Sequence, residues 1–194
     1  AEHPLLSAGP RRRGRGDRAM NTKKQSPIRR RTMLALCAAI ALILSLVEMA
    51  IPSLSPVPGV KIGLPNIMTL VVFYLYDRRS ALAVLLTRVV LASIFAGQLM
   101  MLPYSLSGGL LCFAVCALIL RAFPLKRLWL SSMIGAVCHN IGQILAAIVL
   151  TSTPEIIWYL PVLLVSGLIS GLITGFAAQY VLLHWTKLKW HRDS

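Results

Sequence analysis

Six long apolar runs, separated by short polar or proline-containing segments, occupy the chain beyond residue 31. An α-helix needs about 20 mainly apolar residues to cross the hydrocarbon core of a bilayer, and most of the runs approach that length. The pattern therefore predicts an all-α integral membrane protein with six transmembrane helices. The predicted helices comprise residues 32–51, 62–76, 80–97, 103–120, 128–150 and 161–185.

The segments between the runs have the composition of loops and turns. Residues 52–61 contain three prolines and Gly59, which predicts a stiff non-helical loop. Residues 151–155 predict a tight turn, and the nearby Trp158 and Tyr159 are placed where aromatic side chains anchor a helix at the membrane interface.

The most informative pattern within a run is the face of the fifth one that carries Gly135, His139 and Gln143. These residues, at i, i+4 and i+8, share one side of an α-helix, which Gly142 and Ala146 also occupy. Small residues let another helix approach closely, and polar groups in a span must face protein or a cavity. Two interpretations follow: these polar side chains form hydrogen bonds between packed helices, or they line a ligand pocket.

Composition supports a single membrane domain. Hydrophobic residues make up 57 % of the 194 residues and charged residues 13 %, whereas about 25 % are charged in typical soluble domains. We expect a disordered basic tail over residues 1–31, a six-helix membrane domain over 32–186 and a short basic tail over 187–194. Residues 1–19 differ in composition from the segment that begins at Met20, and we interpret them as a non-native addition or translated upstream sequence.

The net charge of +14 is distributed as a topology signal. Residues 1–31 contain ten lysines and arginines and two acids, and the remaining positive charge lies mostly at the ends of the runs. With six spans these basic segments all fall on one side of the membrane, which predicts cytoplasmic N- and C-termini for the domain. No basic surface on a folded module is visible, so we expect no nucleic-acid partner. The basic segments beyond the tail are residues 78–79, 121–127 and 187–192.

No motif for hydrolytic or transfer chemistry is present. The sequence has no GxxxxGK[ST] phosphate-binding loop and no HExxH motif. Its six acids are spread along the chain, so no aspartate-rich cluster can hold Mg²⁺ against a diphosphate. The four cysteines all lie in apolar runs and are interpreted as packing residues. We therefore predict no catalytic residues, no metal and no cofactor.

Ionisable and amide side chains within the runs define a candidate binding site, because burying such groups in a membrane is costly. With a rise of about 1.5 Å per residue, Glu48 lies roughly 24 Å from the cytoplasmic start of the first span, His139 roughly 16 Å along the fifth, and Gln143 roughly 6 Å further. Lys61 and Asn66 begin the second span at the outer side. These groups therefore share the outer half of the membrane, where a pocket could open outward.

Two further polar residues complete the predicted site, and one charged residue is placed outside it. Asn140 follows His139 directly, and Ser107 lies in the polar start of the fourth run. Arg88, roughly 12 Å from the inner end of the third run, is expected to snorkel inward or to pair within the bundle. The predicted substrate-binding residues are Glu48, Lys61, Asn66, Ser107, His139, Asn140 and Gln143.

Three motifs resemble those of a known family of membrane proteins. They are PGVKIGLPN at residues 58–66, Gly108-Gly109, and GAVCHNIGQ at residues 135–143. Over residues 32–185 the chain resembles the Gx transporter family, which is also labelled heptaprenyl diphosphate synthase component I. That family is similar in size and topology to the S-components of energy-coupling factor transporters, six-helix proteins of the bacterial cell membrane that capture a vitamin-like molecule from outside.

The resemblance implies partners and further residue roles. S-components dock on a separate membrane coupling subunit that works with two cytoplasmic ATPases. Ala35 and Ala39 would match the small-residue motif of the first helix that contacts this coupling subunit, and residues 52–61 would act as a lid over the pocket. The implied function is a substrate-binding subunit in contact with membrane lipids.

The resemblance also leaves other functions open. Members are similar to a membrane component of flavin-based extracellular electron transfer systems. A catalytic prenyl diphosphate synthase is a soluble protein with aspartate-rich motifs, which this chain lacks, so we expect at most a non-catalytic accessory subunit of a polyprenyl diphosphate or quinone pathway. A membrane enzyme that uses His139 and an acid is a third hypothesis, but no second catalytic group lies at a fitting spacing.

Overall fold

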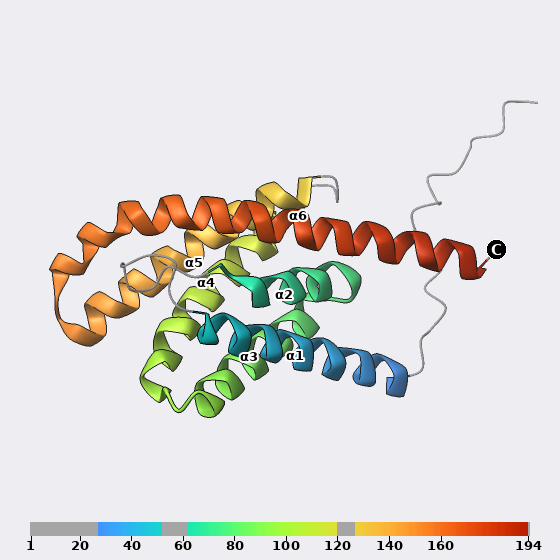
Figure 1. Ribbon diagram of the computed structural model, residues 1–194, viewed down its shortest axis with the longest axis horizontal. Helices are drawn as coiled ribbons and strands as arrows, with labels where there is room; N and C mark the ends of the chain where they lie inside the picture. The colour runs from blue at the N-terminus through green and yellow to red at the C-terminus, as the bar shows by residue number, and fades with distance from the viewer. Residues whose placement is uncertain (1–26, 52–61, 120–126, 194) are drawn as a thin grey trace, which may run out of the picture.

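The computed structural model describes residues 27–51, 62–119 and 127–193, with side chains described as far as residue 185. Over these ranges the protein is helical, as predicted (Figure 1). Six α-helices and two short 3-10 helices follow one another in the described ranges. They are α1 (Pro27–Ala50), α2 (Leu64–Leu75), α3 (Arg78–Phe95), a 3-10 helix (Leu99–Met101), α4 (Leu102–Ile119), α5 (Leu128–Thr151), a 3-10 helix (Pro154–Tyr159) and α6 (Leu160–Asp193).

Four helical segments in the described part of the chain are long and apolar enough to cross a membrane: α1, α5, and the continuous segments Leu99–Ile119 and Pro154–Trp185. By the length and composition of these four segments, the prediction of a multi-pass membrane protein is confirmed. Helix α2 has 12 residues, and so spans about 18 Å, which is shorter than the hydrocarbon core. Six spans with both termini in the cytoplasm therefore stay a prediction.

The helices extend beyond the predicted membrane domain at both ends. Helix α1 begins at Pro27, so residues 27–31 are helical although they were expected in the disordered tail. Proline is well suited to the first turn of a helix, where its missing N–H has no partner to lose. Helix α6 continues to Asp193 through the segment expected as a tail, because lysine and arginine are good helix formers and no proline interrupts them.

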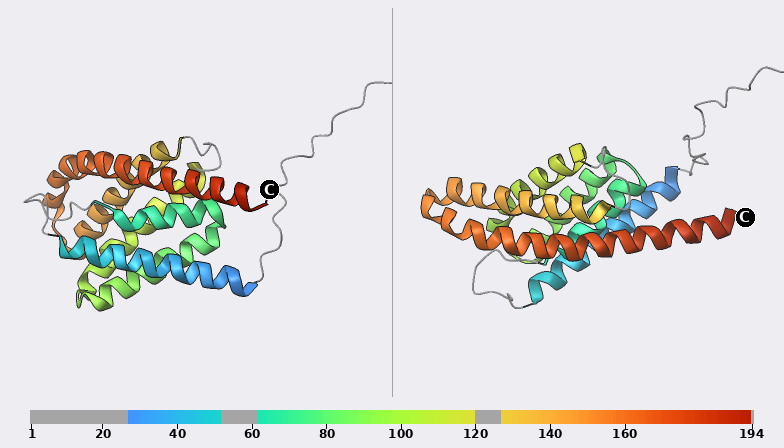
Figure 2. Two further views of the ribbon diagram at one scale, coloured as in Figure 1. Left: turned by 45° about the vertical axis from the view of Figure 1, so that its right-hand side comes forward. Right: turned by 90° about the horizontal axis from the view of Figure 1, so that it is seen from above.

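Five helices form a closed ring of neighbours, in the order α2, α3, α4, α5 and α6, with α6 returning to contact α2. Helix α1 packs against α2 and α3 (Figures 1 and 2). The most extensive contacts join α5 to its two neighbours, α4 and α6. This arrangement encloses the polar face of α5 between helices that come from both halves of the chain.

Glycines allow α5 to lie very close to its neighbours. A Cβ atom on Gly171 of α6 would lie 2.7 Å from the Cα atom of Met133, and one on Gly142 of α5 would lie 2.9 Å from the Cα atom of Gly108 on α4. A methyl group fits at neither position without moving backbone. The close helix contact predicted from the small residues of the fifth run is confirmed.

Large apolar side chains cover the outside of the bundle. The side chains of Leu118 and Val149, for example, are about three quarters exposed, and many other leucines, isoleucines and valines on the outer faces are at least one third exposed. A protein in water rarely presents so much apolar surface. This surface is suited to contact with lipid tails, as a multi-pass membrane protein requires.

Candidate functional site

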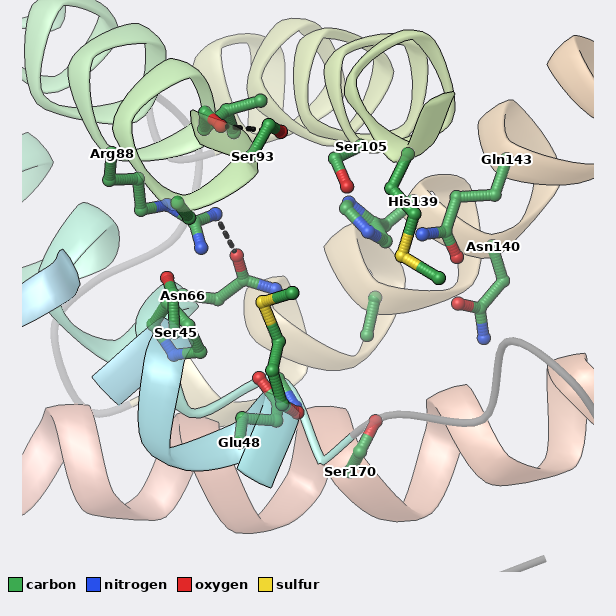
Figure 3. A pocket seen from close by; sticks show the side chains of 17 residues that line it. Ser45, Glu48, Asn66, Arg88, Ser93, Ser105, His139, Asn140, Gln143 and Ser170 are labelled. Atoms are coloured by element: carbon green, nitrogen blue, oxygen red, sulfur yellow. Dashed lines mark hydrogen bonds between the residues drawn. The ribbon is translucent and has the colours of Figure 1, made fainter. Parts of the chain in front are cut away.

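A polar pocket with a volume of about 90 Å³ lies inside the bundle, and all six helices contribute to its wall (Figure 3). Pockets for drug-sized ligands commonly have about 300–1,000 Å³, so this pocket is smaller than a drug-sized site and suits only a compact molecule. The lining residues are Ser45, Glu48, Met49, Gly63, Pro65, Asn66, Arg88, Val89, Ala92, Ser93, Met101, Ser105, Ala136, His139, Asn140, Gln143 and Ser170.

Five of the seven predicted substrate-binding residues line this pocket: Glu48, Asn66, His139, Asn140 and Gln143. The helix order explains how they meet. Glu48 is near the end of α1 and Asn66 near the start of α2, while the other three lie on consecutive turns of α5. Because the chain reverses direction between α1 and α2, the end of α1 and the start of α2 lie at the same level of the bundle as the middle of α5.

The remaining two predicted residues are not part of the described pocket. Ser107 lies on the helix contact between α4 and α5, where its hydroxyl can donate to the carbonyl oxygen of Tyr104 or of Gly142, each 3.0 Å away. It stabilises packing and is absent from the pocket wall. Lys61 and the predicted lid at 52–61 lie outside the described residues.

The position of His139 and Gln143 depends on a glycine of α4. A Cβ atom on Gly108 would lie 2.7 Å from the backbone oxygen of His139 and 2.8 Å from Cγ of Gln143. The absence of a side chain at Gly108 thus lets α4 lie against this face of α5. The His139 ring and the Gln143 amide then point into the space beside Ser105 (Figure 3).

Asn140 both lines the pocket and joins two helices. Its side-chain amide donates a hydrogen bond to the backbone oxygen of Leu163 in the first turn of α6. Gly167 makes room for this amide, because a Cβ atom there would lie 2.6 Å from the Asn140 nitrogen. The two interpretations of the polar face of α5, contact between helices and pocket lining, therefore both apply at this residue.

Arg88 is a pocket residue that was not predicted as one. Its guanidinium donates a hydrogen bond of 2.7 Å to the side-chain oxygen of Asn66, so the expected pairing within the bundle is confirmed. The residue is only 7 % exposed. Its side chain extends from α3 towards the pocket (Figure 3). The signal available in the sequence was the charge itself, because an ionisable residue inside a span commonly has a functional role.

Comparison with known proteins assigns the family. Residues 37–181 match the family model of heptaprenyl diphosphate synthase component I. The chain belongs to this family. The match runs from α1 to α6 and includes every described pocket residue, and it confirms the resemblance predicted from the three motifs. No curated protein and no solved structure matches the chain.

The outer face of α1 in this component I family protein carries the two residues predicted to contact a partner. Ala35 and Ala39 are exposed, on the side of the helix opposite to Cys37, which packs against the α2–α3 core. Larger exposed side chains, such as that of Ile43, flank them on the same face. The two alanines thus form a shallow, apolar surface that another helix could approach closely.

Proposed function

We propose that this component I protein is the substrate-binding membrane subunit of an energy-coupling-factor-like transporter, and that it captures a small vitamin- or cofactor-like molecule from outside. The observation that carries the proposal is the polar pocket enclosed by all six helices of an otherwise apolar bundle. A pocket with a few polar groups that converge on one space is the usual form of a small-molecule site.

The level of the pocket along the bundle supports capture from outside. Its lining residues come from the end of α1, the start of α2, the second half of α3 and the start of α4. Under the predicted topology, with cytoplasmic termini, these positions lie in the outer half of the membrane. A ligand would then enter from the side opposite to the basic helix ends.

Energy for transport would come from partners, because the chain has no phosphate-binding loop of its own. The exposed surface around Ala35 and Ala39 on α1 is the proposed contact with a membrane coupling subunit. Cytoplasmic ATPases would act through that subunit. The pocket and this surface lie on different parts of α1, so ligand and partner can be bound at the same time.

The alternative proposal is a non-catalytic membrane accessory subunit of a polyprenyl diphosphate or quinone pathway, or of a flavin-based extracellular electron transfer system. The name of the family, which refers to a component of a synthase, favours this alternative. We propose no catalytic role for the chain itself, because a lone acid and an imidazole among the described pocket residues do not make a diphosphate site with bound Mg²⁺.

Co-purification tests the binding proposal. The protein is purified in detergent, denatured, and its small-molecule content measured by mass spectrometry. Wild type is expected to carry a molecule that a His139→Ala/Gln143→Ala double variant carries at much lower occupancy. If wild type and the double variant are equally empty, the pocket is not a substrate site and the proposal fails.

Partner capture separates the two proposals. Membranes that contain the tagged protein are solubilised gently, and co-purifying proteins are identified. The transporter proposal expects ATPases and a membrane subunit to co-purify with wild type. They should be lost in an Ala35→Trp/Ala39→Trp double variant and kept in an Ile169→Trp control, since Ile169 lies on the outer face of α6. Recovery of a prenyl synthase or redox proteins instead supports the accessory subunit.

A further inference from the structure

We infer that the pocket binds a small organic monocarboxylate, whose acid group pairs with the guanidinium of Arg88. This inference rests on the proposed function, because it names the substrate class of the same pocket. Arg88 would be the anchoring residue, and the amide and hydroxyl groups of the wall would contact the remainder of the molecule.

The first observation is a buried cation with no carboxylate in ion-pair contact among the described residues, although Glu48 of the same pocket acts on it at longer range. Only 7 % of the surface of Arg88 is exposed, so the residue is about 93 % buried. Arginine stays charged in proteins. In the described part of the chain its one hydrogen-bond partner is the neutral side chain of Asn66, and it forms no ion pair there. Its Nε atom is buried with no partner among those residues. A buried charge of this kind is costly unless an opposite charge compensates it.

The second observation is that this guanidinium lies at the pocket wall, where a ligand could place a carboxylate in direct contact with it (Figure 3). The planar guanidinium presents several N–H donors in a fork that matches the two oxygens of a carboxylate. Asn66 occupies one NH₂ group. The remaining donors of Arg88 can therefore bind a carboxylate without breaking the hydrogen bond that holds the side chain in place.

Charge balance favours a carboxylate over a phosphate. Among the described lining residues, Arg88 is the cation and Glu48 the acid. The two opposite charges already balance, so a monocarboxylate adds a single negative charge to the pocket, whereas a phosphate monoester adds about −1.5 to −2 at neutral pH. Repulsion from the Glu48 carboxylate therefore opposes a phosphate more strongly than a monocarboxylate, and the monocarboxylate can contact Arg88 directly.

The rest of the wall limits the size and polarity of the molecule. The volume of about 90 Å³ suits a short carbon skeleton. Met49, Val89, Ala92 and Met101 provide apolar contacts for it. The amide of Gln143 projects into the same space (Figure 3) and can bind a hydroxyl, keto or amide group of the ligand.

Two substitutions test the role of the guanidinium. Arg88→Gln removes the charge but keeps a hydrogen-bond donor for Asn66. Asn66→Asp keeps Arg88 and adds, without changing shape, a carboxylate at the position now 2.7 Å from the guanidinium. This internal acid would occupy Arg88 in place of the ligand. Arg79→Gln serves as the matched control, since Arg79 is an exposed arginine in the first turn of the same helix.

The measurement is the content of small molecules in each purified protein, by liquid chromatography and tandem mass spectrometry. Wild type and Arg79→Gln are expected to carry a molecule that loses carbon dioxide on fragmentation. Its occupancy is expected to fall about tenfold or more in Arg88→Gln and in Asn66→Asp, because a charge-assisted contact is lost. Circular dichroism and gel filtration check that each variant is folded, and if Arg88→Gln is not, Asn66→Asp decides.

Three results would overturn the inference. Wild-type occupancy in either pocket variant would show that Arg88 has a structural role alone. A neutral, cationic or phosphorylated molecule in wild type would reject the substrate class. If that molecule is nevertheless lost in a Gln143→Ala variant, the proposed binding function stands while this inference fails. An empty wild-type protein would instead reject the binding function, and the substrate class with it.

Discussion

The backbone N–H of Gly63 donates a hydrogen bond to the side-chain carboxylate of Glu48, 15 residues earlier, and so ties the end of α1 to the start of α2. Gly63 is the N-cap of α2 and has a φ angle of 78°, which glycine adopts without strain. A carboxylate at a helix N-terminus is also favoured by the helix dipole. Both residues line the pocket, so this contact shapes its rim.

We expect Gly63→Ala to lower the free energy of unfolding by about 1–2 kcal/mol, because a Cβ atom is strained in the left-handed region. Thermal unfolding in detergent measures the loss. Gly97→Ala is the control, since Gly97 has a similar φ of 65° but lies in open space away from the pocket. Both variants should lose stability, whereas Gly63→Ala alone should lower ligand occupancy. Equal occupancy in the two variants would contradict a role of Gly63 in the pocket.

Gly171→Ala should loosen the contact between α5 and α6. The new methyl group would lie 2.7 Å from the Met133 Cα atom and 2.9 Å from the Ala136 Cβ atom, so the helices must move apart. We expect a loss of about 1–3 kcal/mol in the free energy of unfolding, typical of overpacking. Ile169→Ala, on the exposed face of the same helix, should change it by less than about 0.5 kcal/mol. Similar melting temperatures for both variants would argue against the close packing.

Acid should weaken the contact that Asp77 makes at the start of α3. Its carboxylate accepts hydrogen bonds of 3.0 Å from the Ser80 N–H and from the Arg30 guanidinium. The hydrogen bonds from Ser80, its side chain first, and the nearby Arg30 hold the pKa of Asp77 below its usual value. The folded state therefore favours the ionised carboxylate, and this stabilisation is present above about pH 4 and lost as the pH falls through the lowered pKa.

The measurement is the melting temperature of wild type and Asp77→Asn in detergent between about pH 6 and pH 3. Asparagine also caps helices, so the substitution removes the charge and little else. Because the Asp77 side chain is 45 % exposed, we expect wild type to be more stable by less than about 1 kcal/mol at the higher pH. The difference in stability between wild type and Asp77→Asn should disappear towards the lower pH. A gap that does not change with pH would exclude the ionised carboxylate as its source.

Ser107 and Gln143 should separate stability from binding. We expect Ser107→Ala to cost about 1 kcal/mol in the free energy of unfolding, through a lost hydrogen bond between α4 and α5, and to leave ligand occupancy unchanged. Gln143→Ala should lower occupancy with a smaller effect on stability, since this amide faces the pocket. Mass spectrometry and thermal unfolding of the two variants check this. Loss of ligand in Ser107→Ala would restore that residue to the binding set.

Cysteine labelling tests the predicted topology. Single cysteines are introduced at Thr153 and Arg127, both exposed at opposite ends of α5, in a background without the four native cysteines. A membrane-impermeant maleimide added to intact cells should label Thr153→Cys and should label Arg127→Cys only after the membrane is permeabilised. The reverse result would place both termini outside the cell and the pocket entrance on the cytoplasmic side.

Much of the helix pattern was predictable because it is local. The predicted fifth run, 128–150, differs from α5 by one residue at its C-terminal end. The second run is less well defined, since α2 is only 12 residues long. Its boundaries depend on Gly63 and on the contact with Glu48 as well as on hydrophobicity.

The composition of the pocket was only partly predictable, because periodicity relates residues on one helix but does not say which helix covers each face. His139 and Gln143 were predicted together because they share a face of α5. Ser107 was grouped with them, yet its hydroxyl faces the backbone of α5. Arg88 was placed outside the site, yet its side chain reaches the pocket wall through its contact with Asn66.

The sequence alone thus determined that this is a helical membrane protein and which residues are too polar for lipid, because run length and residue chemistry are properties of short segments. Only the tertiary structure decided which of those polar groups share a space and which are used in packing. The reason is physical: the distance between side chains on different helices depends on how closely the backbones approach, and glycines such as Gly108 and Gly167 set that approach.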